Sequence, residues 1–330
     1  MKKTYIVTGC AGFIGSHISE ALIADRNNSV IGIDNFNDYY SPKIKESNIQ
    51  KLLTSTQFKL HKIDLKNTEK VEALIKRIKP DFIIHCAGMA GVRNSIQNPL
   101  TYTQNNILAT QNILEAIRIS QLDTKIVLLS SSSVYGIQEK TPFVENMVAN
   151  PSSPYGVSKF AMELLAKEYS NHYDMKIAIV RPFSIYGPRG RVDMAPFLII
   201  KAAIQGKPFY QFGTNENKRD WTYIDDFVDG VTGLTKKWSF KTFEVFNLGN
   251  NTPVGIEDFI SISKKLIGEK LNLDLTVLHK ERGSEELPIT FANIDKSHNL
   301  IGYTPKIKLE DGLNEFYTYF KKYRGVYDLS

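Results

Sequence analysis

Tyr155 and Lys159 are the two residues whose spacing most directly suggests chemistry. Residues four apart share one face of a helix, so the Lys159 ammonium can lie near the Tyr155 phenol. A nearby positive charge favours the phenolate and lowers the tyrosine pKa from its usual value of about 10. The pair could therefore supply a general base that takes a proton from a hydroxyl group. This spacing is common by chance, and its weight comes from the motifs that precede it.

A glycine-rich turn near the N-terminus predicts a dinucleotide site. Gly9, Gly12 and Gly15 stand between an apolar run and a segment with helical periodicity. Glycines let the backbone turn tightly and approach a pyrophosphate, and the N–H groups at the start of the next helix attract its charge. Asp34 closes the second apolar run about 20 residues further on, where a carboxylate accepts hydrogen bonds from the adenosine ribose. A purely structural turn between strand and helix is the alternative.

Asp34 also favours NAD over NADP as the cofactor. A carboxylate at this position repels a 2′-phosphate. The segment 35–38, Asn-Phe-Asn-Asp, contains no arginine that could accept such a phosphate. The sequence therefore predicts NAD.

The order of the segments predicts a Rossmann-like α/β fold with a doubly wound parallel sheet. Short runs rich in β-branched residues predict strands at 5–7, 30–34, 58–63, 82–85, 126–129 and 177–180. Segments with helical periodicity predict helices that include 16–24, 68–78, 101–119 and 155–172. Alternating strands and helices imply parallel strands with helices on both faces of the sheet. Such sheets bind ligands at the carboxyl ends of their strands, and the serine run 130–133 directly follows one of them.

Proline and glycine become frequent after residue 180, which predicts a change of domain. We expect an NAD-binding domain at 1–180 and a smaller nucleotide-sugar-binding lobe at 181–330. The apolar segment 243–248 resembles one more buried strand that rejoins the first domain. The C-terminal lobe is therefore expected to be interleaved with the sheet.

Composition excludes several classes of protein. The 330 residues are 42% hydrophobic with a net charge of +6, and the basic residues are scattered, which argues against a nucleic-acid partner. No apolar stretch is long enough for a membrane helix. Cys10 and Cys86 both lie in apolar runs, which favours unpaired thiols in a reducing compartment and hence the cytoplasm. The histidines lack metal-ligand spacing, so no metal site is expected.

Taken together, these motifs resemble extended short-chain dehydrogenase/reductases that act on nucleotide sugars, and the resemblance covers nearly the whole chain. Within that family the sequence is most similar to UDP-glucuronate 4-epimerases. This likeness rests on Asp34-Asn-Phe-Asn-Asp-Tyr-Tyr40, on Ala90-Gly-Val-Arg-Asn-Ser95 and on the segment Gly187-Pro-Arg-Gly-Arg-Val-Asp-Met-Ala195.

The resemblance implies roles for three catalytic residues. Tyr155 takes the proton from the sugar O4, Lys159 holds the nicotinamide ribose, and Ser131 hydrogen-bonds O4 and relays the proton. Hydride passes from C4 to the nicotinamide, and the 4-keto sugar then turns over and takes the hydride back on its other face. The sequence of steps has no net redox change, so NAD must stay bound throughout.

The resemblance also implies binding residues. The expected NAD contacts are Gly9, Gly12, Phe13, Ile14, Gly15, Asp34, Asn35, Asp64, Leu65, Ala87, Asn106, Tyr155 and Lys159. The expected contacts with the UDP-sugar are Arg93, Ser132, Ser133, Ser184, Arg191, Arg219, Arg282 and Glu286.

The expected substrate contacts have different roles. Arg219 and Arg282 would bind the diphosphate, and Arg191 or Arg93 would bind a C5 carboxylate unless either forms an internal salt bridge. Glu286 would replace the family's ribose-binding aspartate, because the segment after Gly283 is about two residues longer than is usual in the family. The helices 101–119 and 155–172 would form a homodimer interface.

Four alternatives remain open on the sequence. A 4-epimerase for UDP-glucose or UDP-N-acetylglucosamine would not need Arg191 to bind a carboxylate. A UDP-glucuronate decarboxylase shares the same 4-keto acid intermediate. A 4,6-dehydratase would need an Asp-Glu pair beside the serine run, where this chain has Ser132 and Ser133. A non-enzymatic NAD-binding regulator would have lost Tyr155 or Lys159, and both are present.

Overall fold

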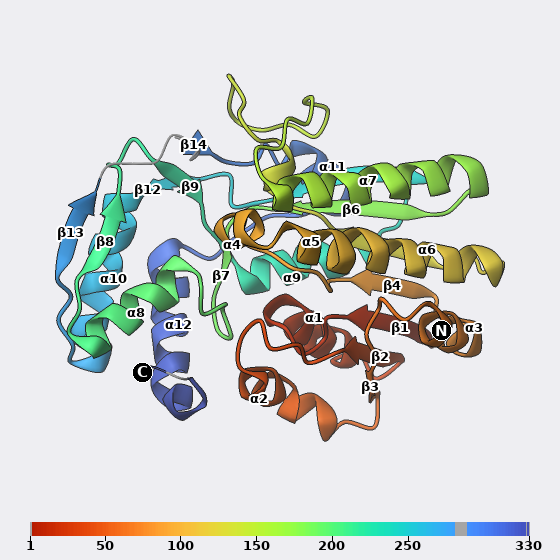
Figure 1. Ribbon diagram of the computed structural model, residues 1–330, viewed down its shortest axis with the longest axis horizontal. Coiled ribbons are helices and arrows are strands. Elements are labelled where there is room, and N and C mark those ends of the chain that lie inside the picture. The colour runs from red at the N-terminus through yellow and green to blue at the C-terminus, as the bar shows by residue number, and fades with distance from the viewer. Residues whose placement is uncertain (1, 281–288, 328, 330) are drawn as a thin grey trace.

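The computed structural model describes residues 2–280, 289–327 and 329. Its centre is a seven-stranded sheet with the strand order β11-β6-β5-β4-β1-β2-β3 (Figure 1). All pairs in this sheet are parallel. The strands are β1 (Lys3–Thr8), β2 (Asn28–Asp34), β3 (Phe58–Lys62), β4 (Phe82–His85), β5 (Lys125–Leu129), β6 (Ile177–Pro182) and β11 (Phe243–Leu248). The predicted Rossmann-like α/β fold is confirmed.

Helices cover both faces of the sheet because successive strand residues point into two different cores. In β1, Ile6 belongs to one apolar core and Val7 to the other. The helices α3 (Thr68–Ile78), α6 (Ala109–Ile119) and α7 (Pro154–Tyr173) supply apolar residues to the first core. The helices α1 (Phe13–Ile23), α2 (Pro42–Leu53) and α9 (Ile224–Lys236) supply them to the second.

The chain reverses its direction of travel across the sheet between β1 and β4. From β1 it passes to β2 and β3 on one side, and β4, β5 and β6 follow on the other. A crevice opens at the carboxyl ends of the strands where such a reversal occurs. The glycine turn after β1 and the loop after β4 therefore lie at the expected ligand-binding edge.

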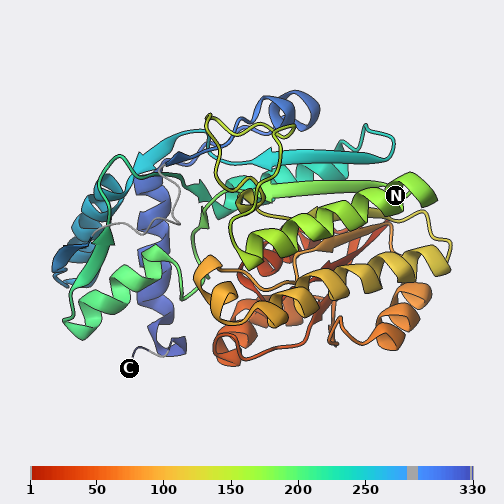
Figure 2. The same ribbon diagram turned by 45° about the horizontal axis from the view of Figure 1, so that its top comes forward.

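A smaller lobe lies beside this edge, at the left of Figures 1 and 2. It contains α8 (Ala195–Gln205), β8 (Phe209–Phe212), β9 (Lys218–Asp220), β12 (Pro253–Gly255), α10 (Ile256–Leu271), β13 (Val277–Lys280), β14 (Ile289–Thr290) and α12 (Leu309–Tyr323). The buried Asp220 carboxylate joins its parts, because it accepts hydrogen bonds from the backbone N–H groups of Asn250, Asn251 and Ala292.

The lobe is interleaved with the sheet rather than appended to it. Between β9 and β12 the chain returns through α9 to β11, which pairs with β6 along the segment expected at 243–248. The remaining short elements are α4 (Val92–Gln97), α5 (Pro99–Tyr102), β7 (Ile185–Tyr186), β10 (Thr222–Tyr223), α11 (Asp295–Ile301) and two 3₁₀ turns, η2 (Ser132–Val134) and η3 (Arg324–Val326). The domain boundary near residue 180 stays a prediction.

Two predicted helices differ in detail from the observed ones. The first begins at Phe13 rather than at residue 16, directly after Gly12. The segment expected as one helix at 101–119 contains a π-helical part, η1 (Thr103–Leu108), between α5 and α6. Among the described residues, no helix is long and apolar enough to cross a membrane.

Candidate active site

The turn between β1 and α1 requires glycine at two positions. Gly9 has a φ of +65°, and a Cβ there would lie 2.8 Å from the backbone nitrogen of Ala87. A Cβ on Gly15 would lie 2.2 Å from the Gly9 carbonyl oxygen. Gly12 precedes α1 and gives it no side-chain cap, so the first N–H groups of the helix stay available to an anion. The turn has the form that a pyrophosphate needs.

Asp34 is held in place at the end of β2. Its carboxylate accepts hydrogen bonds from the backbone N–H groups of Ala11 (3.1 Å) and Phe36 (2.8 Å). The Lys45 ammonium lies 3.8 Å from the carboxylate and donates to the Asn37 side chain at 3.0 Å. The buried Lys45 partly offsets the negative charge of Asp34. An acidic residue is thus fixed where an adenosine ribose would bind.

One cavity joins these features. Ten of the thirteen expected NAD contacts line it, namely Gly9, Gly12, Phe13, Ile14, Gly15, Asp34, Asn35, Asp64, Leu65 and Ala87. Its lining continues along the loop after β4 through Gly88, Met89 and Ala90 and reaches Arg191. A glycine turn, a helix N-terminus and a ribose-binding carboxylate in one cavity fit NAD.

Asn106 supports this cavity from behind instead of lining it. The side chain is fully buried in η1, and its amide donates to the Met89 carbonyl (3.0 Å) and the Ser158 hydroxyl (2.8 Å). Its Oδ1 accepts a hydrogen bond from the Met89 N–H. A Cβ on Gly88 would lie 2.9 Å from this oxygen. Asn106 therefore fixes the loop after β4 against the helix that carries Tyr155.

Tyr155 and Ser131 lie together at the start of α7 and the end of β5. Tyr155 is buried near Ser131, and it belongs to a small apolar cluster with Met89 and Tyr102. Burial raises the pKa of the Tyr155 phenol, while the polar Ser131 side chain and the positive charge of Arg191 oppose this rise. The phenol is thus kept neutral until a positive charge or a bound ligand compensates it.

Lys159 lies one helical turn beyond Tyr155, fully enclosed by protein. Its ammonium donates to the Leu129 carbonyl at 2.8 Å. Burial lowers the pKa of Lys159 to about 8, and the nearby Cys86 and Glu163 oppose this change. The structure therefore brings Tyr155, Lys159 and Ser131 to one place, the junction of α7 with the carboxyl end of β5.

A buried ion pair anchors this junction. Glu163, on the next turn of α7, accepts two hydrogen bonds from Arg181 on β6, at 3.0 and 2.6 Å. It also accepts a 2.5 Å hydrogen bond from Ser130, the neighbour of Ser131. The Glu163 and Arg181 side chains are each only 5% exposed. Sequence reasoning did not single out Glu163, although it shares a helix face with Tyr155 and Lys159.

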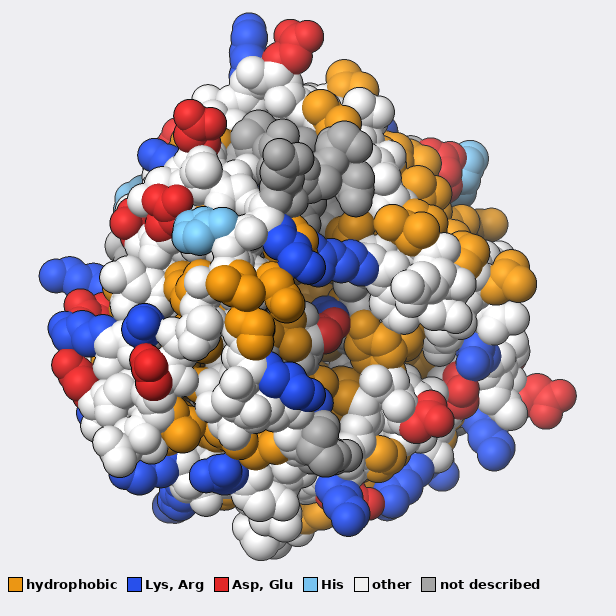
Figure 3. All heavy atoms as spheres, turned by 60° about the vertical axis from the view of Figure 1, so that its left-hand side comes forward, with side chains coloured by type: hydrophobic (Ala, Val, Ile, Leu, Met, Phe, Trp, Pro, Cys, Tyr) orange, Lys and Arg blue, Asp and Glu red, His pale blue; other side chains and the backbone are white. Residues whose placement is uncertain are grey.

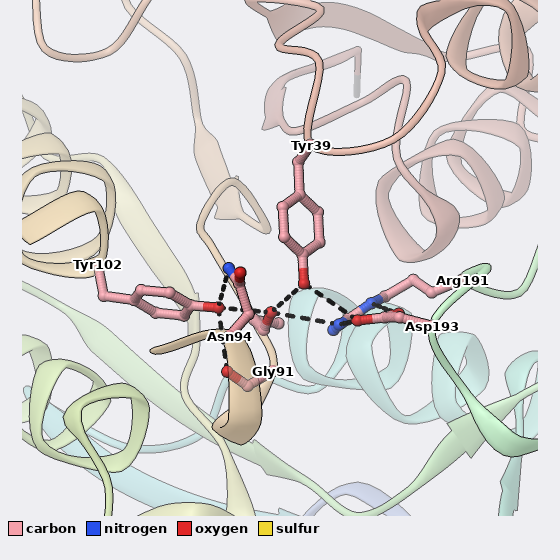
Figure 4. A network of polar contacts seen from close by, with 7 residues as sticks. Tyr39, Gly91, Asn94, Tyr102, Arg191 and Asp193 are labelled. Carbon is pink, nitrogen blue, oxygen red and sulfur yellow. Dashed lines mark hydrogen bonds and ion pairs between the residues drawn. The ribbon is translucent and has the colours of Figure 1, made fainter. Parts of the chain in front are cut away.

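Arg191 lines the far end of the cavity and forms an internal ion pair. Its guanidinium makes two hydrogen bonds with Asp193, one of them 2.9 Å from Nε to Oδ1, and donates to the Ala90 carbonyl at 3.2 Å (Figure 4). The Tyr39 hydroxyl is 3.1 Å from both the same carbonyl oxygen and the Asp193 carboxylate. The expected internal salt bridge of Arg191 is therefore present, with Asp193. Arg191 also lines the cavity, where it could contact the carboxylate of a substrate.

The other expected substrate residues come from several different elements. Ser132 and Ser133 form the short turn after Ser131, and Ser184 lies between β6 and β7 at the same sheet edge. The Arg93 guanidinium lies 5.2 Å from the centre of the Phe212 ring, which connects α4 with the lobe. Arg219 is half-buried on β9. Arg282 and Glu286 lie outside the described residues.

Figure 3 shows one face of the molecule. A hollow lies near its centre, with Lys and Arg side chains at the rim and hydrophobic side chains on both sides. Such a surface suits a ligand that has both anionic and apolar parts. Across the described residues, no group of three or more metal-binding side chains occurs.

Sequence reasoning missed several cavity-lining residues, including Tyr39, Tyr40 and Lys45. Tyr39 and Tyr40 belong to the segment 34–40 that carries the family resemblance, which is the signal that could have identified them. Lys45 lies in the first turns of α2, a helix that was not named, and nothing in its spacing points to Asp34.

Comparisons with known proteins place the chain in a family. The sequence pattern described as GDP-mannose 4,6 dehydratase matches residues 6–316. The chain belongs to this family. UDP-glucuronate 4-epimerase from Thermodesulfobacterium geofontis is 37% identical over 96% of both chains. UDP-glucuronate 4-epimerase 1 from Arabidopsis thaliana is 36% identical over 97% of this chain and 77% of the plant protein.

Solved structures agree with this placement. The crystal structure of UDP-glucuronic acid 4-epimerase from Bacillus cereus in complex with UDP-glucuronic acid and NAD superposes with a TM-score of 0.89 at 36% identity. The match covers 97% of this chain and 99% of that one. UDP-glucose 4-epimerase from Thermotoga maritima matches with a TM-score of 0.85 at 25% identity. The predicted membership of the NAD-dependent, nucleotide-sugar branch of the extended short-chain dehydrogenase/reductases is confirmed.

Proposed function

We propose that this protein is an NAD-dependent UDP-glucuronate 4-epimerase, which interconverts UDP-glucuronate and UDP-galacturonate. The observation that carries the proposal is a cavity that runs from the glycine turn to Arg191, with Tyr155 close enough to Ser131 and Arg191 for both to influence its phenol. Relatives at 36–37% identity over nearly the whole chain bear the same name, and one binds UDP-glucuronic acid together with NAD.

The residues around C4 are arranged for proton transfer. In the proposed mechanism, Ser131 orients the sugar O4 and relays its proton to Tyr155, whose phenol lies close enough to Ser131 to be influenced by it. The cationic Lys159 lies on the same helix face and favours the phenolate when a ligand neutralises the cost of burial. Bound NAD supplies the hydride acceptor and donor. Tyr155 returns the proton after the keto sugar has turned its other face toward the cofactor.

Arg191 is the proposed contact for the C5 carboxylate. A guanidinium binds a carboxylate through paired hydrogen bonds, and Arg191 already binds the Asp193 carboxylate in this manner. A neutral hexose would offer it no such partner. Arg219 is the proposed diphosphate contact, and Ser132, Ser133 and Ser184 are the proposed contacts with the sugar.

A neutral UDP-hexose remains the second candidate substrate, because Arg191 is already neutralised within the protein. The structure of UDP-glucose 4-epimerase shows that the same fold serves such a sugar. A 4,6-dehydratase is disfavoured despite the family's name. Its elimination step would need an acid and a base at the positions of Ser132 and Ser133.

We also propose a homodimer through α6 and α7, with α5 and η1 at its edge. These helices lie side by side (Figure 2), and they carry large apolar side chains that are exposed. The exposed residues are Leu100, Leu108, Ile119, Val157 and Leu164. Light scattering coupled to size exclusion should give twice the chain mass, and a monomer at micromolar concentration would contradict the interface.

Cys10 and Cys86 are free thiols, which supports the expected cytoplasmic location.

Incubation with a panel of UDP-sugars, without added cofactor, tests the proposed reaction. NMR of the products separates epimerisation, decarboxylation and dehydration in one assay. We expect UDP-glucuronate to give UDP-galacturonate without loss of carbon dioxide. Turnover of UDP-glucose at a higher kcat/KM than UDP-glucuronate would overturn the proposed substrate.

A further inference from the structure

Three donors lie within hydrogen-bond distance of the Ala90 carbonyl oxygen: two tyrosine hydroxyls and one guanidinium N–H. The oxygen lies 3.1 Å from the Tyr39 hydroxyl, 3.0 Å from the Tyr102 hydroxyl and 3.2 Å from Arg191 Nη2 (Figure 4). A carbonyl oxygen has only two lone pairs. These donors compete for it, and Tyr39 and Arg191 have a second acceptor in Asp193.

The Asp193 carboxylate is therefore the main counter-charge of Arg191. It binds the guanidinium through both oxygens and also lies within hydrogen-bond distance of the Tyr39 hydroxyl. Both charged side chains come from the loop between β7 and α8. Gly91 lets the Tyr39 and Arg191 side chains lie close to its own backbone. A Cβ on Gly91 would lie 3.2 Å from the Tyr39 hydroxyl and 3.3 Å from Arg191 Nη2.

The two members of the ion pair differ in how firmly they are enclosed. The Arg191 side chain is 22% exposed and lines the cavity, whereas the Asp193 side chain is 37% exposed. A carboxylate so exposed regains water when it turns away, so its release costs little. Arg191 would lose more, because its other contact is a single carbonyl.

A second carboxylate cannot join this arrangement without cost. The charge of Arg191 balances one carboxylate, and two carboxylates on one guanidinium repel each other. Arg191 and Asp193 also lie close enough to Tyr155 for their charges to act on its phenol. A uronate held near Tyr155 therefore meets Asp193 at the same cation.

We propose that Asp193 is an internal counter-ion that the carboxylate of the substrate displaces from Arg191. This inference rests on the proposed function, since it takes Arg191 as the carboxylate contact. Asp193 then acts as a specificity-determining residue. An acidic sugar replaces the Asp193 carboxylate on Arg191 with its own carboxylate, while a neutral sugar leaves the Arg191–Asp193 ion pair intact.

Binding to the NAD-loaded protein tests the exchange, in a Tyr155→Phe background that prevents turnover. Because Asp193→Asn removes the competing charge, it should tighten UDP-glucuronate by about threefold or more, as expected for a partly exposed ion pair. Affinity for UDP-glucose should change by less than about twofold. Tyr39→Phe should also tighten UDP-glucuronate, to a smaller extent, because it removes a donor to Asp193. Titration calorimetry measures both sugars.

Asp38→Asn is the matched control, because it removes the same charge from an exposed side chain next to Tyr39. It should leave the affinities for both sugars unchanged. If Asp193→Asn weakens UDP-glucuronate binding or leaves it unchanged, the exchange is refuted, and Asp193 instead orients Arg191 or has no part in binding.

Arg191→Ala separates this failure from a failure of the proposed carboxylate contact. If Arg191→Ala weakens UDP-glucuronate selectively but Asp193→Asn does not tighten it, only the exchange is wrong. If Arg191→Ala weakens both sugars equally, the assignment of Arg191 itself is wrong, and the exchange fails with it.

Discussion

Glu163→Gln should destabilise the protein strongly, because it leaves Arg181 buried without its counter-charge. Glu163 accepts two hydrogen bonds from Arg181 and one from Ser130, and both charged side chains are 5% exposed. Removing one partner of such a buried pair costs about 3–5 kcal/mol. This is a large part of the 5–15 kcal/mol that stabilises a typical domain. Urea unfolding of the NAD-loaded protein, followed by circular dichroism, measures the change.

Glu168→Gln is the control on the same helix. Glu168 pairs with His172 at 3.3 Å, but its side chain is 61% exposed, so its loss should cost less than about 1 kcal/mol. Replacing both buried partners, as Glu163→Leu with Arg181→Met, should cost less than the sum of the two single changes. A Glu163→Gln protein within about 1 kcal/mol of the parent would show that the ion pair does not anchor α7.

Three further predictions concern the cofactor, the base and the response to acid. Tyr155→Phe should retain NAD, seen by absorbance after denaturation, and lose about 10²–10⁴-fold in kcat because the base is gone; near-normal turnover would refute its role. Gly15→Ala should lose NAD, since its Cβ would lie 2.2 Å from the Gly9 carbonyl, whereas Gly325→Ala, with no atom within 4 Å, should retain it. Burial lowers the pKa of His85 to about 3, against about 6.5 when unfolded, so stability falls as pH drops through this range. His85→Asn should flatten that loss in urea titrations between pH 6 and 4; an unchanged slope would show that other groups cause it.

The fold could be predicted because its central strands are buried on both faces. Strands such as β1, β4 and β5 read as short apolar runs, since residues pointing either way enter a core. Helix ends were harder to place. α1 begins at Phe13, but Gly12 before it provides no side-chain cap, so no capping residue marks this start in the sequence. The segment η1 also has helical periodicity in the sequence, so the pattern does not reveal the additional residue of its π-helical turn.

The candidate site could be predicted only where a motif is local. The glycine turn, Asp34 and Tyr155 with Lys159 each lie within one element or its end. Long-range contacts were inaccessible: Tyr39 meets Ala90 across 51 residues and Asp193 across 154. The sequence left open whether Arg191 binds a substrate carboxylate or an internal one. The structure shows that its guanidinium pairs with the Asp193 carboxylate, two residues further along the chain.

The π-helical segment η1 sets the register between the two parts of the long helical stretch from Pro99 to Ile119. A π-turn corresponds to one inserted residue, and each residue in an α-helix rotates the chain by about 100°. Deleting one residue from 103–108 would therefore swing Tyr102 and Leu100 around the axis while α6 stayed docked on the sheet. A relative one residue shorter here would carry a regular helix and turn a different surface toward Tyr155 and toward any neighbouring subunit.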